Sequence, residues 1–382
     1  MWFFTEEHKL LQKSVRDFAQ AVLAPQIDHL DEVEGYDRSY FTKMGEMGLL
    51  GITVPEQFGG TEMGCVAATI AMEEIGAVDA STALSYLAHS MLAVNNIATN
   101  ANDEQKRRYL PKLISGQSIG GMGMTEPGAG SDALAMSTRA VKKGNKYILN
   151  GTKMFITNAV IGDTFYVYAR TGDGRKDIST FIVQADFPGF KMGKKLKKMG
   201  MRASPTGELI FENCEVPAEN LVGREGDSVS HMIKNLDIER ITISGISLGI
   251  ARASIEASVK YAKERTQFGR PIADFQMIQE RLAEAQAEYE SCAAYTYNAA
   301  KEWDEGLLDP MRSRALGAKV KLVTAQMATQ VALDAIQILG GYGYIKEFPV
   351  ERYMRDAKLM EIGAGTNEML RVIIAKDMLG AD

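Results

Sequence analysis

The chain has 382 residues, 46% of them hydrophobic and 24% charged, which is ordinary for a globular protein and excludes an intrinsically disordered one. Its formal net charge of −6 argues against a nucleic-acid partner. With four histidines and three widely separated cysteines, we expect neither a metal site built on imidazoles nor a disulfide framework.

The first part of the chain has the spacing of amphipathic helices. From Thr5 the apolar residues recur every three or four positions, and we expect Pro25 to end this first helix. Further helices are predicted over residues 39–49, 65–76, 81–98 and 104–115. The sequence thus predicts a helical domain over residues 1–119.

Near Ile119 the pattern changes to that of β-strands. Residues 140–150 form a predicted strand, a Gly-Asn turn and a second strand, and β-branched or aromatic runs follow at 164–170, 180–184 and 207–213. The helical pattern returns in three long segments at 228–264, 274–305 and 310–339. We therefore predict a β domain over residues 120–226 and a helical bundle domain over residues 227–382.

The chain starts with Met-Trp-Phe-Phe-Thr-Glu-Glu and lacks the pattern of a signal or transit peptide. No apolar run suggests a transmembrane segment. We expect a cytoplasmic protein, or a mature matrix-type enzyme without its transit peptide.

The segment Gly121–Asp132, GMGMTEPGAGSD, combines glycines and a proline with Thr125, Ser131 and Asp132. Glycines allow backbone to approach a ligand closely, and the polar groups offer hydrogen bonds to it. A Gly-rich connecting loop fits the spacing equally well.

A helix over residues 232–249 is apolar around most of its circumference, which predicts burial. Glu239 falls on the face of Met232 and Ile243, without a cation at i±3 or i±4. Such a carboxylate either pairs with an arginine from another segment, or burial raises its pKa into the range that suits a general base. The pattern alone favours the structural pair.

Four segments have residue types suited to a phosphorylated or nucleotide-like ligand. The spacing of Asp237 and Arg240 allows them either to pair on the helix surface or to bind such a ligand. The turn 265–276 places a guanidinium, an aromatic ring and an amide together, although a plain helix connection is the alternative. Residues 337–343 indicate a glycine C-cap or close ligand approach, and residues 361–368 lead into a helix N-terminus.

Taken together, several strings resemble the acyl-CoA dehydrogenases over nearly the whole chain, and within that family the isovaleryl-CoA dehydrogenases. The matching strings are 84–90, 124–132, 155–158, 236–240, 337–344 and 355–368. Several motifs in the right order are more specific than any one of them. The resemblance implies a mainly α fold with an N-terminal helical domain, a middle β-barrel-type domain and a C-terminal four-helix bundle.

The resemblance also implies FAD bound non-covalently between the β domain and the bundle, with a second subunit completing the site. It assigns cofactor contacts to Met122, Met124, Thr125, Gly130, Ser131, Phe155, Ile156, Thr157, Arg265, Phe268, Gln276, Gln337, Leu339, Gly340, Gly341, Thr366, Asn367 and Glu368. It assigns contacts with the acyl-CoA substrate to Ser131, Asp237, Arg240, Ala364 and Gly365. Such enzymes form homotetramers, as dimers of dimers, and pass electrons to electron transfer flavoprotein.

The position of the catalytic base departs from the commonest family pattern. Most members have a carboxylate immediately before the Gly-Thr of the C-terminal turn, where this chain has Ala364. Isovaleryl-CoA dehydrogenases have it at the position of Glu239, so the resemblance reverses the preference for a structural role. Glu239 would take the α-proton while hydride leaves the β-carbon for flavin N5. The thioester carbonyl would be bound by a flavin ribityl hydroxyl and the backbone N–H of Ala364.

Three other departures bear on the substrate. Phe155 stands where the family usually has a tryptophan beside the flavin, and Ser230 and Met360 stand where the isovaleryl enzymes have tyrosines, which would reshape the acyl pocket. A short branched acyl-CoA is therefore the favoured substrate. An alicyclic acyl-CoA such as cyclohexane carboxyl-CoA, a flavin-binding relative without turnover, and an oxygen-reducing oxidase are the alternatives.

Overall fold

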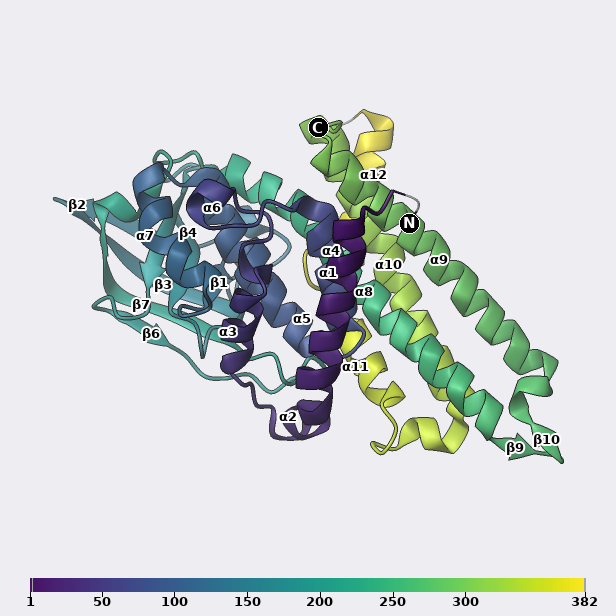
Figure 1. The fold of residues 1–382 in the computed structure, drawn as a ribbon. Helices are drawn as coiled ribbons and strands as arrows, with labels where there is room; N and C mark the ends of the chain where they lie inside the picture. Colours follow the sequence, from purple (N-terminus) through teal and green to yellow (C-terminus); the bar gives the residue numbers. More distant parts are fainter. Residues whose placement is uncertain (2, 381–382) are drawn as a thin grey trace.

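One helix of 37 residues, α8 (Ser228–Glu264), crosses the molecule and contacts both the N-terminal helices and the other long helices. The computed structural model describes residues 1 and 3–380, apart from the side chains of residues 310 and 311. Figure 1 shows a β-sheet at one end, the long C-terminal helices at the other, and N-terminal helices between them. This is the mainly α, three-part fold that we predicted.

The N-terminal part is helical, as expected. Its α-helices are α1 (Glu6–Phe18), α2 (Ile27–Val33), α3 (Ser39–Glu46), α4 (Gly64–Gly76), α5 (Ala80–Leu87), α6 (Asn95–Asn100) and α7 (Asp103–Ile114). The prediction that Pro25 ends the first helix is wrong, because a π turn (Ala19–Leu23) and a 3₁₀ turn (Ala24–Gln26) carry the chain into α2. Pro25 lies in the first turn of the 3₁₀ segment, where a missing N–H costs little. A second π turn (Ala88–Val94) joins α5 to α6.

The middle part is one eight-stranded sheet with strand order β6-β7-β3-β2-β4-β5-β8, and β1 pairs with β4. Its strands are β1 (Gly120–Gly123), β2 (Arg139–Lys143), β3 (Lys146–Thr157), β4 (Thr164–Arg170), β5 (Ile178–Gln184), β6 (Phe190–Met192), β7 (Thr206–Pro217) and β8 (Leu221–Val222). Most neighbours are antiparallel, but β1 and β2 both run parallel to β4. The register between β3 and β7 shifts between Lys153 and Ile156, which is a β-bulge.

The C-terminal part contains α8, α9 (Gln276–Asp304), α10 (Pro310–Leu339), α11 (Val350–Met360) and α12 (Asn367–Leu379). A small hairpin of β9 (Thr266–Gln267) and β10 (Arg270–Pro271) joins α8 to α9 and lies at the far end of the bundle in Figure 1. By length and composition, one helical stretch of the described residues, Arg312–Tyr344, is apolar enough to cross a membrane. Half of its most apolar window is buried, as in a core helix of a bundle.

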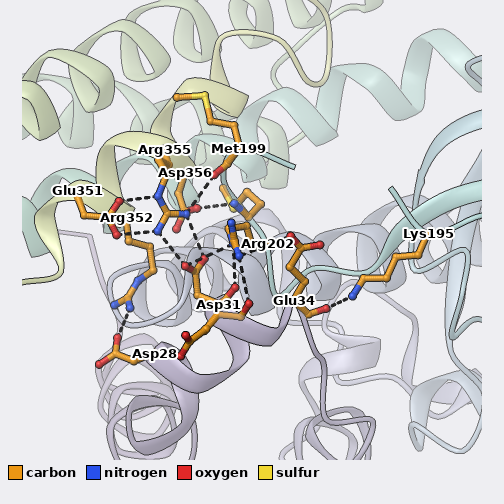
Figure 2. Close-up of polar contacts among 12 residues, drawn as sticks. Asp28, Asp31, Glu34, Lys195, Met199, Arg202, Glu351, Arg352, Arg355 and Asp356 are labelled. Carbon is orange, nitrogen blue, oxygen red and sulfur yellow. Dashed lines mark hydrogen bonds and ion pairs between the residues drawn. The ribbon is translucent and has the colours of Figure 1, made fainter. Parts of the chain in front are cut away.

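A polar junction joins the three parts of the chain. Arg355 on α11 binds Asp31 on α2 at 2.9 Å, and Arg202, from the loop before β7, donates to the Asp31 carbonyl oxygen at 2.9 Å. Asp356, the next residue on α11, is buried and accepts a hydrogen bond from the backbone N–H of Met201. Figure 2 shows these groups meeting between α2, the loop and α11. The junction fixes α11, and with it the start of the turn that follows, against the rest of the molecule.

Candidate active site

Glu239 lies in the first third of α8 and only 5% of it is exposed. One of its carboxylate oxygens, Oε2, has no hydrogen-bond partner among the described residues. Burial raises the pKa of Glu239 to about 7, while the positive charges of Arg240 and Lys321 oppose that rise. A buried carboxyl group with a free oxygen and a pKa near neutrality suits a general base. The structural arginine pair that the pattern favoured is absent from the described residues.

The turn Glu361–Thr366, which lies between α11 and α12, reaches this part of α8. Ala364 and Gly365 both have left-handed backbone, with φ of 54° and 100°. Arg240 Nε donates to the Ala364 carbonyl oxygen at 3.2 Å, and Lys321 Nζ on α10 donates to the Gly365 carbonyl oxygen at 2.8 Å. The turn is thus held beside Glu239 by two cations from two different helices.

Asp237 and Arg240 form an ion pair with 3.5 Å between Oδ1 and Nη1. The prediction of a pair on the helix surface is wrong in its location, because both side chains are more than 90% buried. The packing of α10 explains the burial: a Cβ on Gly317 would come within 2.9 Å of the Asp237 carbonyl oxygen. Burial also raises the pKa of Asp237 to about 7, against the charges of Arg240 and Arg314.

The Gly121–Asp132 segment begins beside the same helix. Met122 on β1 lies next to Asn235 on α8, whose amide nitrogen is 3.7 Å from the Met122 sulfur. The Thr125 carbonyl oxygen accepts from the Met154 N–H at 2.8 Å, and the Met124 carbonyl oxygen accepts from Lys153 Nζ at 3.1 Å. The backbone of the segment is therefore fixed along β3.

The second half of this segment is open to solvent. A Cβ at Gly128 or Gly130 would meet no atom within 4 Å, and Ser131 is exposed. Asp132 pairs with Arg175 at 2.7 Å. The glycines at these positions are thus not needed for packing inside one chain, and the backbone is free for close approach by a ligand.

Phe155 lies at the bulge in β3 with a left-handed φ of 60°, and 65% of its side chain is exposed. An aromatic residue in this conformation is strained, and such strain is common at ligand sites. Thr157 is half-buried. Ile156 instead packs in the hydrophobic core of the sheet, so only its backbone can face a ligand.

A second group of predicted residues lines a cavity of about 550 Å³ at the far end of the bundle. Arg265 meets Leu339, Gly340 and Gly341 there, and its guanidinium lies 5.6 Å from the ring centre of Tyr342. Phe268 lies at the tip of the hairpin, 94% exposed, and Gln276 and Gln337 are also exposed. The structure thus brings the arginine and the glycines together.

The two groups lie far apart within one chain. Glu239 and Arg265 are separated by 26 residues of α8 and its C-cap, and a rise of 1.5 Å per residue places them about 39 Å apart. This distance is greater than one dinucleotide can span.

The start of α12 completes the set of predicted residues. Thr366 is the N-cap and its hydroxyl accepts from the Met369 N–H at 3.4 Å. Asn367 is buried with a side-chain oxygen that has no partner among the described residues, whereas Glu368 is exposed.

Sequence reasoning missed Lys321 and the buried pair of Lys153 and Glu126, whose charged atoms are 2.8 Å apart. A signal for Lys321 was present, because Gly317, Ala318, Thr324 and Ala325 surround it at helical spacing and small residues mark a close helix contact. No comparable local signal linked Lys153 to Glu126, since they are 27 positions apart.

Three family models cover most of the chain. The N-terminal, middle and C-terminal domains of acyl-CoA dehydrogenase match residues 5–117, 121–214 and 229–379. Among solved structures, a chain in "Electron transferring flavoprotein of Acidaminococcus fermentans: Towards a mechanism of flavin-based electron bifurcation" superposes with a TM-score of 0.96. It is 40% identical, over 99% of both chains. Butyryl-CoA dehydrogenase from Megasphaera elsdenii superposes with a TM-score of 0.95, at 36% identity over 98% of this chain and 99% of that one.

Curated relatives agree with this assignment. Mitochondrial isovaleryl-CoA dehydrogenase of Pongo abelii is 44% identical over 97% of this chain and 88% of its own length. A mitochondrial 2-methylacyl-CoA dehydrogenase of Solanum tuberosum is 42% identical over 98% of this chain and 90% of its own length. With its three domain matches, its fold and these full-length relatives, the chain belongs to the acyl-CoA dehydrogenase family of flavoprotein oxidoreductases.

Proposed function

We propose that this enzyme catalyses the FAD-dependent α,β-dehydrogenation of a short branched-chain acyl-CoA, of the isovaleryl-CoA type, with Glu239 as the base. The single observation that supports it best is the unpaired oxygen of the buried Glu239 carboxylate, beside the left-handed turn at Ala364. Ala364 itself has no ionisable group, so the base comes from α8.

The residues fit an FAD cofactor. Buried polar atoms on Asn235, Glu239 and Asn367 lack partners within the described chain, and the glycines at 128 and 130 leave space beside the backbone. The cavity at Arg265 offers a guanidinium and open glycines, which suit a pyrophosphate and the adenosine next to it. Met122, Met124, Thr125, Phe155 and Thr157 would hold the flavin ring, and FAD supplies the acceptor for the β-hydride when it is bound.

The chemistry of the protein side chains follows from their surroundings. Ionised Glu239 takes the α-proton of the thioester, and its buried carboxyl group becomes neutral. The backbone N–H of Ala364 would bind the thioester carbonyl and stabilise the negative charge that develops on its oxygen. Asp237, Arg240, Gly365 and Ser131 would contact the rest of the thioester.

The separation of the two groups of residues supports a site shared between copies. Because Glu239 and Arg265 lie about 39 Å apart on one chain, Arg265 and Gly340–Gly341 of one subunit would hold the FAD whose flavin reaches Glu239 of another. The exposed apolar residues Phe268, Met277 and Tyr344 at that end suit a subunit contact. A homotetramer in the cytoplasm that passes electrons to electron transfer flavoprotein is the assembly we propose.

The acyl chain is the least constrained part of the proposal. Met360, which we placed in the acyl pocket, is 1% exposed and packs in the main core, while Ser230 is exposed and donates to the Asp227 carbonyl oxygen. A flexible Met side chain adapts to more than one apolar shape. A panel of isovaleryl-CoA, 2-methylbutyryl-CoA and cyclohexane carboxyl-CoA with a dye acceptor, and with peroxide release measured in air, would separate the branched, alicyclic and oxidase alternatives.

The test of the base is Glu239→Gln, with Glu256→Gln on the same helix as a matched control. Glu256 is exposed, so its loss should leave turnover unchanged. Glu239→Gln should retain FAD but lose at least about 100-fold in the rate of anaerobic flavin bleaching by substrate. Bleaching at the control rate would remove Glu239 from the mechanism.

A further inference from the structure

Two buried cations converge on two consecutive carbonyl groups. Arg240 on α8 donates to the carbonyl oxygen of Ala364, and Lys321 on α10 donates to that of Gly365. Neither carbonyl belongs to a regular helix, because the turn Glu361–Thr366 separates α11 from α12. Arg240 has an ion-pair partner in Asp237.

Lys321 differs from Arg240 in its partners. It is 2% exposed, and no carboxylate lies within ion-pairing distance of it in the part of the chain that the structure describes. Burying an ammonium group without a carboxylate partner is costly, and a neutral donor could make the same hydrogen bond to Gly365. Burial lowers the pKa of Lys321 to about 8, so the amine is still mostly protonated at pH 7, and a lysine at this position indicates an electrostatic task as well as a structural one.

The geometry of the turn shows what that task would be. Left-handed backbone at a residue with a Cβ costs about 1–2 kcal/mol, so Ala364 keeps its φ of 54° only if neighbours hold it. The hydrogen bonds from Arg240 and Lys321 hold the 364–365 and 365–366 peptide groups, and they thereby keep Ala364 in the left-handed conformation on which the direction of its own N–H depends.

We infer that Lys321 is a positioning residue for dehydrogenation: it fixes the Ala364–Gly365 turn so that the Ala364 N–H faces the thioester carbonyl, and it places a positive charge beside Glu239. The inference rests on the proposed function, because it assigns a role to a group that supports the proposed base and carbonyl donor.

The titratable groups around this site come from α8, α10, β4, the turn Glu361–Thr366 and the start of α12. Arg240 neighbours Glu239 on α8, Lys321 and Arg314 come from α10, and Tyr168 on β4 also faces Glu239. Glu361, at the start of the turn, and Glu368, in the first turn of α12, face Lys321. The acidic residues of α4, Glu73 and Glu74, pair with Arg252 more than three turns further along α8. Removing the Lys321 charge therefore leaves Arg240 as the main cation beside the base.

The experiment compares Lys321→Met with Lys319→Met in the FAD-loaded enzyme. Lys319 lies two residues away on α10, faces a different direction and pairs with Asp377 on α12 at 3.1 Å. Lys321→Met should lower kcat about 100-fold with a smaller change in KM, because a misplaced carbonyl donor acts in the transition state. The acidic limb of its pH profile should move upward by at least about half a unit, since a lost cation raises the pKa of the base. Lys319→Met should change neither quantity.

A binding measurement separates positioning from general damage. Lys321→Met should weaken binding of the enoyl-CoA product at least about tenfold. It should not weaken binding of the matching thioether, in which a methylene group replaces the thioester carbonyl. If the Met variant does not retain FAD, Lys321→Gln takes its place in the pH comparison, because it removes the charge but keeps a neutral donor. Equal weakening of both ligands, or a pH profile like that of Lys319→Met, would overturn the inference. Failure of the proposed function itself is a different result, in which Glu239→Gln turns over normally.

Discussion

Lys153 Nζ lies 2.8 Å from the Glu126 carboxylate, and both side chains are at most 2% exposed. The pair joins β3 to the Gly121–Asp132 segment, and Lys153 also donates to the Met124 carbonyl oxygen. Glu126 accepts in turn from the N–H and hydroxyl of Ser137 and from the N–H of Thr138. Every charged atom of the pair is thus used to fix the backbone on which the flavin site would be built.

Lys153→Met should destabilise the protein by about 3–5 kcal/mol, because it leaves the Glu126 carboxylate buried without its cation. Lys146→Met, on the same strand, removes an exposed pair with Glu215 and should cost less than about 1 kcal/mol. Urea unfolding followed by circular dichroism measures both. Equal midpoints for the two variants would show that the buried pair does not stabilise the fold.

The rate of dehydrogenation should depend on pH through Glu239. Only its ionised form accepts a proton, and burial raises its pKa to about 7. We therefore expect kcat/KM to fall about tenfold per pH unit below pH 7 and to level off above it. A profile that stays flat from pH 8 to pH 5 would contradict the assignment.

The same group should cost stability at high pH. Its folded-state pKa of about 7 lies above the ordinary 4.5, so the folded state loses stability as pH rises from about 4.5 to 7. Glu239→Gln should remove that cost and stabilise the protein by up to about 3 kcal/mol at pH 8. At pH 4.5 the variant and the unchanged protein should have the same free energy of unfolding. Thermal unfolding at the two pH values, with Glu256→Gln as the control, measures the difference.

The polar junction of Figure 2 should contribute to cooperative folding of the three parts. Arg355 joins α11 to α2 through Asp31 and also pairs with Glu351, with side chains that are mostly buried. Arg355→Met should cost about 2 kcal/mol or more. Lys358→Met, on the same helix but with an exposed pair, should cost less than about 1 kcal/mol. A single unfolding transition with the same free energy of unfolding in both variants would show that the junction is dispensable.

Arg265→Met should weaken FAD retention about tenfold to hundredfold, since hydrogen bonds to a charged pyrophosphate are lost. Arg270→Met is a control in the hairpin that follows Arg265, where the guanidinium stacks 4.3 Å from the Phe275 ring centre. Flavin absorbance after gel filtration measures retention. Full flavin content in Arg265→Met would remove this residue from the cofactor site.

The sequence predicted the long elements well, because α8 and α10 are long runs without an internal proline and end at Arg265 and at the glycine after Leu339. It failed at Pro25, where local chemistry allows either a stop or a new helical turn. It also placed the Asp237–Arg240 pair at the surface, since spacing along one helix contains no information on the second helix that covers it. The sequence did not indicate Lys321 for the same reason, because its role depends on a turn 44 residues further along the chain.

The length of α8 has a genetic consequence. If each active site takes its base from one subunit and the residue that binds the pyrophosphate from another, two mutations in different subunits need not inactivate the same active site. A subunit that lacks the Glu239 carboxylate and a subunit that lacks the Arg265 guanidinium would each be inactive alone, yet a mixed assembly would contain some centres built only from intact halves. Co-expression of the two alleles should therefore restore part of the activity that neither allele supports.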